Sequence, residues 1–314
     1  MYYQFTIHNH LLKSWIGFLF SVCLLIQSNS VTAQELEPRS LTNLPVGTNF
    51  ILAGYSFSKG DILLDPAFPI EDLNAQLHAF VGAYARAINF FGLSSKVDVI
   101  VPYAIGDWTG LYTGIDTATS RSGFGDLRVR LSVNMLGAPA LNGSQFAEYK
   151  QKTIFGINVQ VILPTGQYFP EKLINLGSNR FTFRPQLGIS HRTGPWILEA
   201  YMSGWFFLRN TNFLGGNKLN QNPLLAIKFH AIRSLPKGMW VAGGIGYGIG
   251  GRTIINEEEK DTRISALRLG ITFAFPFKTY HALKINFNSG FRFERGPDFD
   301  AIGILYQYRW GKLK

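Results

Sequence analysis

The 314-residue chain is predicted to form one all-β domain, a transmembrane antiparallel up-and-down β-barrel with twelve strands. Two observations predict this fold. Apolar and polar residues alternate along most of the chain after residue 45, and the breaks between the alternating stretches are short and long in turn. The composition agrees, because only 16% of residues are charged while glycine (33) and phenylalanine (26) are abundant.

Residues 1–33 are predicted to be a secretory signal peptide. A weakly basic start with Lys13 precedes the apolar stretch SWIGFLFSVCLLIQ, and Val31 and Ala33 form a small-residue cleavage pattern. The alternative is a membrane anchor, which the short length of the stretch disfavours. The only cysteine, Cys23, lies here, so the mature chain would hold no disulfide and no cysteine metal site. Residues 34–46 are expected to be a short periplasmic segment and residues 47–314 the barrel.

Twelve strands are expected in the barrel. The stretch ALKINFNSGFRFER shows their pattern most clearly, with Leu283, Ile285 and Phe287 on one face and Lys284 and Asn286 on the other. The expected ranges are 47–59, 73–91, 94–106, 123–137, 152–164, 179–193, 195–209, 221–234, 238–252, 262–276, 280–295 and 299–311.

The connections predict which end of the barrel faces the periplasm. Short breaks such as GLSSK, RTGP and LPKG alternate with longer polar ones near 60–72, 107–122 and 165–178. Outer-membrane barrels place short turns in the periplasm and long loops outside the cell. Two breaks fit poorly, because GAPALNGSQFAEYK is long for a turn and GPDF is short for an outer loop.

The solvent on each face distinguishes a membrane barrel from a soluble all-β protein. Soluble strands expose many charges, and about a quarter of a typical globular domain is charged. Here the polar face carries mostly Gly, Ser, Asn, Gln and Arg, and aromatic residues gather near strand ends, as in interfacial girdles. We therefore expect the apolar face to meet lipid and the polar face to line a lumen. Pro185 is unusual inside a strand, since proline removes a ladder donor.

The expected lumen face is rich in basic residues. They are Arg86, Arg128, Arg130, Arg184, Lys228, Arg268, Lys284, Arg292 and Arg309, against the acidic Asp98, Asp126, Glu199 and Glu294. Rings of Arg and Lys favour anions in a pore. The alternative is structural, since charges that pair across strands can seal a narrow barrel. Tyr201, Trp205 and Phe207 share the same face and form a candidate surface for an aromatic solute, with ordinary packing as the alternative.

One strand would have almost no inward side chains. In VAGGIGYGIGG the inward positions are Ala242, Gly244, Gly246, Gly248 and Gly250. The glycine spacing resembles a nucleotide-binding motif, but no strand–turn–helix context surrounds it. Something bulky is expected to fill this space: an inserted loop, the N-terminal segment 34–46, or a solute.

Several stretches resemble a known family. The segments LPVGTNFILAGYSF, VDVIVPYAIGDW, SGFGDLRVRL, VILPTGQYFP and RPQLGISHRTGPWILEAYMSGWFF occur in an order that is similar to the outer-membrane family named for the MetA pathway of phenol degradation. The resemblance covers most of the mature chain. It implies an outer-membrane β-barrel that passes small, often aromatic or hydrophobic compounds, and it supplies no set of catalytic or binding residues.

The expected function is passage of a small molecule, aromatic, hydrophobic or anionic, across the bacterial outer membrane. No catalytic residues, metal ligands or cofactor are expected, because the histidines His78, His191, His230 and His281 are isolated and no serine elbow appears. The expected partners are outer-membrane lipid, lipopolysaccharide, the barrel-assembly machinery and a small-molecule solute, with no nucleic acid. The alternatives are a sealed structural or adhesion barrel and an outer-membrane lipid hydrolase.

Overall fold

The computed structural model describes residues 36–61, 70–112, 114–172, 174–293 and 298–311. Twelve antiparallel strands close a ring, as predicted. In ring order from the N-terminus these are β1 (Asn49–Asp61), β2 (Ile70–Phe90), β3 (Leu93–Tyr112), β5 (Arg128–Leu136), β6 (Thr153–Ile162), β7 (Thr182–Thr193), β8 (Trp196–Phe207), β11 (Leu224–Ser234), β12 (Trp240–Gly250), β15 (Ile264–Lys278), β16 (His281–Arg292) and β17 (Asp298–Trp310). Each strand pairs with the next one in this ring order, and the first strand pairs with the last from Asn49↔Trp310 to Asp61↔Asp298.

The two faces of the barrel are reversed relative to a soluble protein. Large apolar side chains point outward and remain exposed, among them Phe80 at 44%, Phe229 at 53% and Ile302 at 55%. The buried polar side chains include Arg130, Gln160, Glu199 and Lys228 on the inner face. Since lipid provides no hydrogen-bond partners, a closed ladder with an apolar outer face is the stable arrangement. The predicted assignment of the two faces is therefore confirmed.

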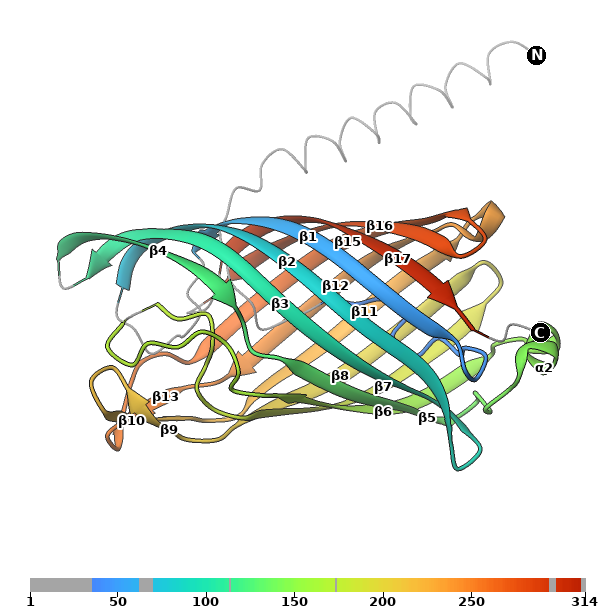
Figure 1. Ribbon diagram of the computed structural model, residues 1–314, viewed down its shortest axis with the longest axis horizontal. Coiled ribbons are helices and arrows are strands. Elements are labelled where there is room, and N and C mark those ends of the chain that lie inside the picture. The colour runs from blue at the N-terminus through green and yellow to red at the C-terminus, as the bar shows by residue number, and fades with distance from the viewer. Residues whose placement is uncertain (1–35, 62–69, 113, 173, 294–297, 312–314) are drawn as a thin grey trace, which may run out of the picture.

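Short connections and the end of β17 gather at one end of the barrel (Figure 1). The β2–β3 turn is Phe91–Gly92, and both residues have positive φ (51° and 82°), as a two-residue type I′ hairpin requires. The connection that seemed too long for a turn contains a helix, α2 (Gly143–Glu148), whose start is closed by a capping box between Asn142 and Gln145. A 3₁₀ turn, η1 (Pro236–Gly238), joins β11 to β12. By the loop-length rule this is the periplasmic end.

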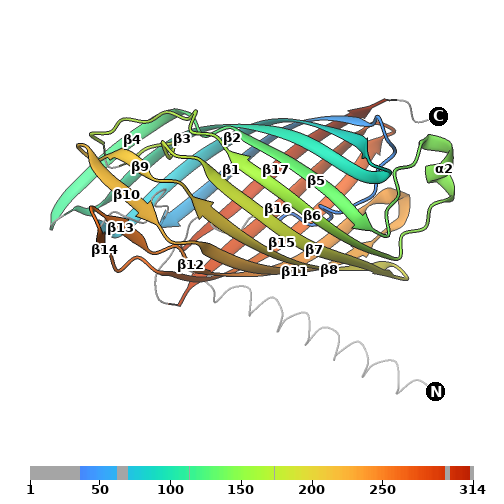
Figure 2. The same cartoon turned by 90° about the horizontal axis from the view of Figure 1, so that it is seen from below.

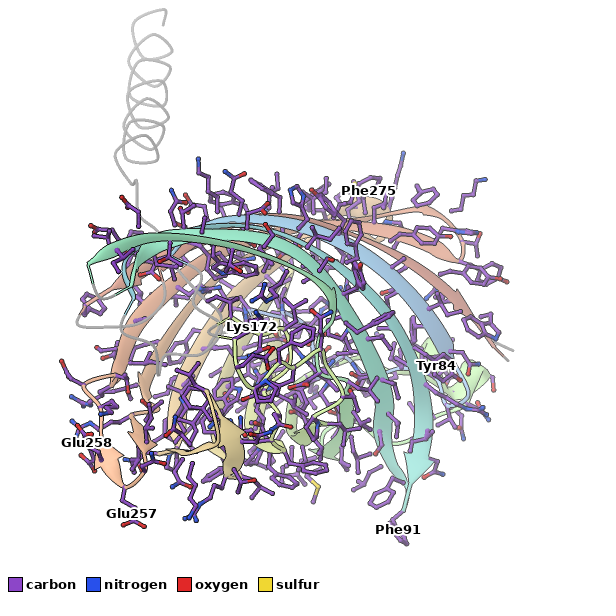
Figure 3. The ribbon with its side chains drawn as sticks, turned by 60° about the vertical axis from the view of Figure 1, so that its left-hand side comes forward. Tyr84, Phe91, Lys172, Glu257, Glu258 and Phe275 are labelled. Atoms are coloured by element: carbon purple, nitrogen blue, oxygen red, sulfur yellow. The ribbon has the colours of Figure 1, made fainter. Side chains whose placement is uncertain are left out.

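Aromatic residues form a band on the outer face near the periplasmic end. The rings of Phe273, Phe275 and Phe277 follow one another along β15, and Tyr308 stacks on Trp310 of β17 with centroids 5.6 Å apart. Figure 3 shows Tyr84, Phe91 and Phe275 pointing away from the wall. The amphipathic rings of Tyr308 and Trp310 suit the membrane–water interface, and the phenylalanine rings extend the apolar surface beside them.

The opposite end carries structure that the sequence analysis assigned to loops. Strand β4 (Ile115–Phe124) pairs with the upper part of β3, and a separate four-stranded sheet contains β9 (Asn210–Phe213), β10 (Asn217–Gln221), β13 (Thr253–Ile255) and β14 (Glu258–Glu259). Figures 1 and 2 show these strands extending the wall at the end away from α2.

Pro185 lies inside β7, where the strand was predicted. It pairs with Val159 of β6, while the β7–β8 ladder passes from Phe183↔Phe206 to Gln186↔Ser203 and gives no pairs between them. The register is the same on both sides of this gap, so the ladder is interrupted at the proline without a bulge. Among the described helices none is long and apolar enough to cross a membrane.

Candidate functional site

The interior of the ring is the candidate site, and it holds most of the predicted lining residues. Arg130, Arg184, Lys228 and Arg268 are buried with 2–8% exposure, and so are Tyr201 (2%) and Trp205 (9%). Lys284, Arg128 and Phe207 are half-buried on the same face. The alternation of each strand therefore brings these residues together as expected.

Three of the predicted residues differ from the rest. Arg86 is exposed, whereas its neighbours Ala85 and Ala87 are buried at 6% and 1%, so Arg86 points outward and its assignment to the lumen was wrong. The small residues of AYARAIN give little contrast between the faces, and a shift of one residue reverses them. Arg309 is exposed at the periplasmic rim and donates to the Thr279 carbonyl oxygen. The side chain of Arg292 lies outside the described residues.

Arginine and aromatic side chains pair inside the outer half of the barrel. The guanidinium carbon of Arg184 lies 4.5 Å from the centre of the Trp205 ring, and that of Arg268 lies 4.4 Å from Phe299. Arg180, which the sequence analysis did not select, lies 4.8 Å from Phe207. In cation–π contacts of this kind, a positively charged side chain that is shielded from water lies against the flat face of an aromatic ring. The lumen therefore presents both positive charge and flat apolar surface.

The segment before β1 lies inside the barrel and not beside it. The predicted periplasmic segment 34–46 is described from residue 36, and we call residues 36–46 the plug. The backbone N–H of Arg39 donates to Glu199 of β8 (2.8 Å), and Asn134 of β5 donates to the Leu41 carbonyl oxygen (3.2 Å). The Val46 N–H donates to Leu141 near the periplasmic end (2.8 Å). Figure 1 shows the dark-blue stretch ahead of β1 between the walls of the ring.

Glycines on the inner wall make room for two leucines of the plug. A Cβ placed on Gly270 would lie 2.8 Å from Leu36, and one placed on Gly156 would lie 2.5 Å from Leu41. Leu41 is 1% exposed and packs in a buried cluster with Ala138, Ile154 and Tyr201. The sequence analysis named the N-terminal segment as one of three possible fillers of the glycine-lined space, and described plug residues occupy part of it.

Charged groups fix the middle of the plug. Glu37 accepts from Nη1 of Arg130 at 2.6 Å, and Nε of the same guanidinium donates to Asp98 at 2.9 Å. Burial acts to raise the pKa of Glu37, but Arg130, Lys96 and Lys284 outweigh it and hold that pKa well below its ordinary range. Neither Glu37 nor Lys96 was selected from the sequence. Lys96 could have been found from the sequence, because it lies an even number of residues from Asp98 along β3 and therefore shares its face.

Glu199 forms a second polar centre with buried partners. Ser190 Oγ donates to Glu199 Oε1 at 3.0 Å, and His230 Nδ1 lies 4.0 Å from Oε2. The serine hydroxyl faces the carboxylate and not the imidazole, which is unlike the nucleophile–base pair of a hydrolase. Within the described part of the chain no three His, Cys, Asp or Glu residues are grouped as metal ligands.

The loop after β6 closes the wall beside β4. Asp126 accepts from the backbone N–H groups of Gly166 and Ser178, both at 2.9 Å, and from Ser178 Oγ at 2.6 Å. Gly166 and Gly177 touch so closely that a Cβ on either would meet the other's backbone at 2.7–2.8 Å. The GFGD and LPTG motifs thus meet in one place. We call this contact between Asp126 and residues 166–178 the Asp126 junction.

A cavity of about 310 Å³ lies at the outer mouth, between the upper parts of β2–β4 and the loop that follows Phe169. Trp108 and Ile174 supply apolar wall, while Thr117, Thr119 and Lys172 supply polar groups. Trp108 is 2% exposed and packs with Leu77 and Phe299. Figure 3 shows Lys172 over the opening of the ring. The volume falls at the lower end of the range for small-molecule sites.

The family model described as "Putative MetA-pathway of phenol degradation" matches residues 57–307. The chain belongs to this family. The resemblance carried by the GFGD and LPTG segments is thereby confirmed. No curated protein matches the chain.

A solved outer-membrane channel shares the fold of this chain, and two other solved structures match it with TM-scores below 0.5. The COG4313 outer membrane channel from Pseudomonas putida F1 superimposes with a TM-score of 0.73 at 19% identity, over 88% of this chain and 100% of that chain. The beta domain of the Bordetella autotransporter BrkA gives a TM-score of 0.47 at 13% identity, over 84% and 100% of the two chains. The CymD monoaromatic hydrocarbon channel gives 0.42 at 10% identity, over 91% and 94%.

Proposed function

We propose that this protein is an outer-membrane channel for a small organic solute and that the plug holds it closed at rest. The observation that carries the proposal is the occupied lumen. The inner wall is lined by basic and aromatic side chains, and a short segment bound by a few hydrogen bonds and ion pairs fills it. A barrel that is permanently sealed can fill its lumen with side chains of its own wall. Here the wall has glycines instead, and they leave space for a segment that can separate from it. The likeness to an outer membrane channel over the whole of that chain supports the same class.

The proposed path begins at the outer-mouth cavity. A solute would rest against Trp108 and then meet the arginine–aromatic pairs of Arg184–Trp205 and Arg268–Phe299. Below them it reaches the plug at Glu37. The outward-facing Arg86 takes no part in this path.

Flux through liposomes tests the proposal. Benzenesulfonate, which is aromatic and permanently charged, would be loaded into liposomes that contain the full chain, a variant lacking residues 36–46, or the outward control Arg86→Gln. We expect slow release from the full chain and from the control, and release at least tenfold faster without the plug. A deletion variant that is folded by heat-modifiable gel mobility yet releases nothing would point to the sealed scaffold instead.

We also propose that residues 1–33 are removed on export and that the barrel is inserted into the outer membrane by the assembly machinery, among lipid and lipopolysaccharide. The exposed apolar belt and its aromatic band support this location. Mass spectrometry of the protein recovered from outer membranes tests it, with Gln34 as the expected first residue. An intact N-terminus would contradict the cleavage.

The remaining alternative is a lipid hydrolase. Ser190 and His230 are 1% and 4% exposed inside the plugged ring, and the serine hydroxyl is bound to Glu199. Lipid has no access to such a group. We therefore propose no enzymatic activity, and unchanged phospholipid in the flux experiment is the expected result.

A further inference from the structure

The carboxylate of Glu37 sits where a ligand would sit, on a preformed basic site. Arg130 reaches it with Nη1 at 2.6 Å and Nη2 at 3.4 Å, while Asp98 accepts from Nε of the same guanidinium at 2.9 and 3.1 Å. Arg130 belongs to β5 and Asp98 to β3, so the wall itself orients the guanidinium. The plug supplies only the carboxylate.

The wall around Glu37 carries more positive than negative charge. Lys96 on β3 lies 3.9 Å from Asp98, and Lys284 on β16 and Lys96 both lower the pKa of Glu37 through their charge. Among Arg130, Lys96, Lys284 and Asp98 the cations outnumber the anion by two. Removal of Glu37 without replacement would therefore leave an excess of positive charge on this part of the inner wall.

A small cavity adjoins this pair. It measures about 10 Å³ and is bounded by Glu37, the cationic Arg130, Arg184 and Lys228, and the polar Ser40, Asn158 and Gln186. That is room for about one water molecule. Nε2 of the buried Gln160, next to Arg184, makes no hydrogen bond among the described residues. Donors therefore converge on a space that the Glu37 side chain already limits.

We propose that Glu37 occupies the binding site for the carboxylate of a small organic anion, and that such a solute opens the channel by replacing Glu37 on Arg130. This inference rests on the proposed function and names its solute class.

The chemistry of the site favours a carboxylate over a neutral solute. A guanidinium fork matches two carboxylate oxygens, and bonds between charged partners are roughly twice as strong as neutral ones. A neutral molecule would displace Glu37 without supplying the negative charge that Arg130, Lys96 and Lys284 require. The cavity has no space for both carboxylates, so binding of the solute and docking of the plug exclude each other.

Accessibility of a single thiol on the plug tests the exchange. Thr42→Cys in the mature protein, which has no other cysteine after residue 33, would report through its rate of reaction with a charged maleimide in the folded protein at constant ionic strength. Acetate and benzoate at millimolar concentration are expected to raise the rate at least fivefold. Benzyl alcohol and chloride are expected to leave it unchanged. An equal response to chloride or to benzyl alcohol would overturn the inference.

Three variants add controls. Glu37→Gln should raise the basal rate and remove the response to acetate, because the plug is already released. Arg130→Lys keeps the charge but loses the fork, so the acetate concentration for half effect should rise about tenfold. Glu258→Gln, on the exposed outer strand β14, should behave as the parent. An unchanged basal rate in Glu37→Gln would contradict the assigned role of Glu37.

The two proposals fail separately. Carboxylate-dependent labelling without flux of benzenesulfonate would reject the channel and retain the binding site. Flux that increases on plug deletion, with labelling indifferent to carboxylates, would retain the channel and reject the solute class.

Discussion

At the residue scale, the glycines of the inner wall matter as much as its charged side chains, because they leave space for the plug. Gly244 and Gly270 lie beside Leu36, and Gly156 lies beside Leu41. Glycine lowers the stability of a strand, so its repeated use on one face indicates that a neighbour needs the space. The sequence therefore predicted that something fills the space beside the glycines. It did not distinguish an inserted loop, the N-terminal segment and a solute, because that depends on contacts between residues far apart in the chain.

Filling one of these spaces should release the plug. In Gly270→Val the new side chain would meet Asn288 of β16, whose Oδ1 lies 2.5 Å from the position of a Cβ, and Leu36 of the plug, whose Cδ1 lies 2.8 Å from it. The wall strand is fixed by its ladder and the plug is not, so we expect a several-fold increase in mean conductance in planar bilayers. Gly243→Val is the matched control, because it is on the neighbouring strand with nothing within 4 Å of its Cβ position. Equal currents from the two variants would argue against contact between Leu36 and the wall.

The charge of Glu37 gives docking a defined pH dependence. Its pKa is lowered from an ordinary value of 4.5 in the docked state, so the docked plug binds fewer protons than the released one. Docking is then fully favoured above about pH 5 and weakens as the pH falls through 4.5 and below. Asp98 accepts from the Arg130 guanidinium from β3, and Lys96 of β3 and Lys284 of β16 act on the Glu37 carboxylate through their charge.

Conductance should therefore be low and constant between pH 7 and 5.5 and should rise below pH 4. Glu37→Gln should show high conductance at every pH. A current that rises with increasing pH instead would show that a different group controls docking.

At the scale of elements, the strands of the membrane wall were predictable and the outer strands were not. Lipid forces a strict two-residue alternation on β1 or β16, and this pattern is visible in sequence. The strand β4 extends beyond that belt and reads IDTATSRSGF, in which neither face is consistently apolar. The same holds for β10 and β13. Their pairing depends on partners far away in the chain, which no local pattern encodes.

The Asp126 junction should control the stability of the outer wall. Asp126→Ala leaves the N–H groups of Gly166 and Ser178 without their acceptor, at a cost of about 1–3 kcal/mol for each buried group. We expect faster proteolysis between residues 163 and 179 and a lower midpoint in heat-modifiability gels. Asp116→Ala, at an exposed position of β4, serves as the control. Equal cleavage in both variants would mean that the loop is held by other contacts.

At the scale of the whole molecule, the barrel combines a basic interior with an apolar exterior. The chain carries a formal charge of +10, and several of its cations lie on the inner wall. The sequence predicted this set well because strand parity assigns faces reliably where polar and apolar residues alternate. The prediction was wrong at Arg86, because the alanines on both sides of it give no difference in polarity between the two faces of the strand.

A basic lumen should select anions once the plug is out. In the variant lacking residues 36–46, the reversal potential in a KCl gradient should indicate preference for chloride over potassium. Adding Arg268→Ala should reduce that preference severalfold, since the side chain lies 8% exposed inside the ring. Arg86→Gln, which removes a charge from the outside, should not. Preference for potassium in all three would contradict a positively charged path.

The closing seam between β1 and β17 has a consequence for how the molecule is made. Residues 49–60 pair with residues 75–86 on one side, and residues 49–61 pair with residues 298–310 on the other side, so the ring keeps two open edges until the last strand is in place. Pairing over such a separation is slow, because the intervening chain loses conformational entropy before the contact provides any stabilisation. The plug directly precedes the strand that closes the seam. Once docked, the plug therefore holds the start of β1 near the periplasmic end of the ring, where the Val46 N–H donates to the Leu141 carbonyl oxygen and where the seam has to form.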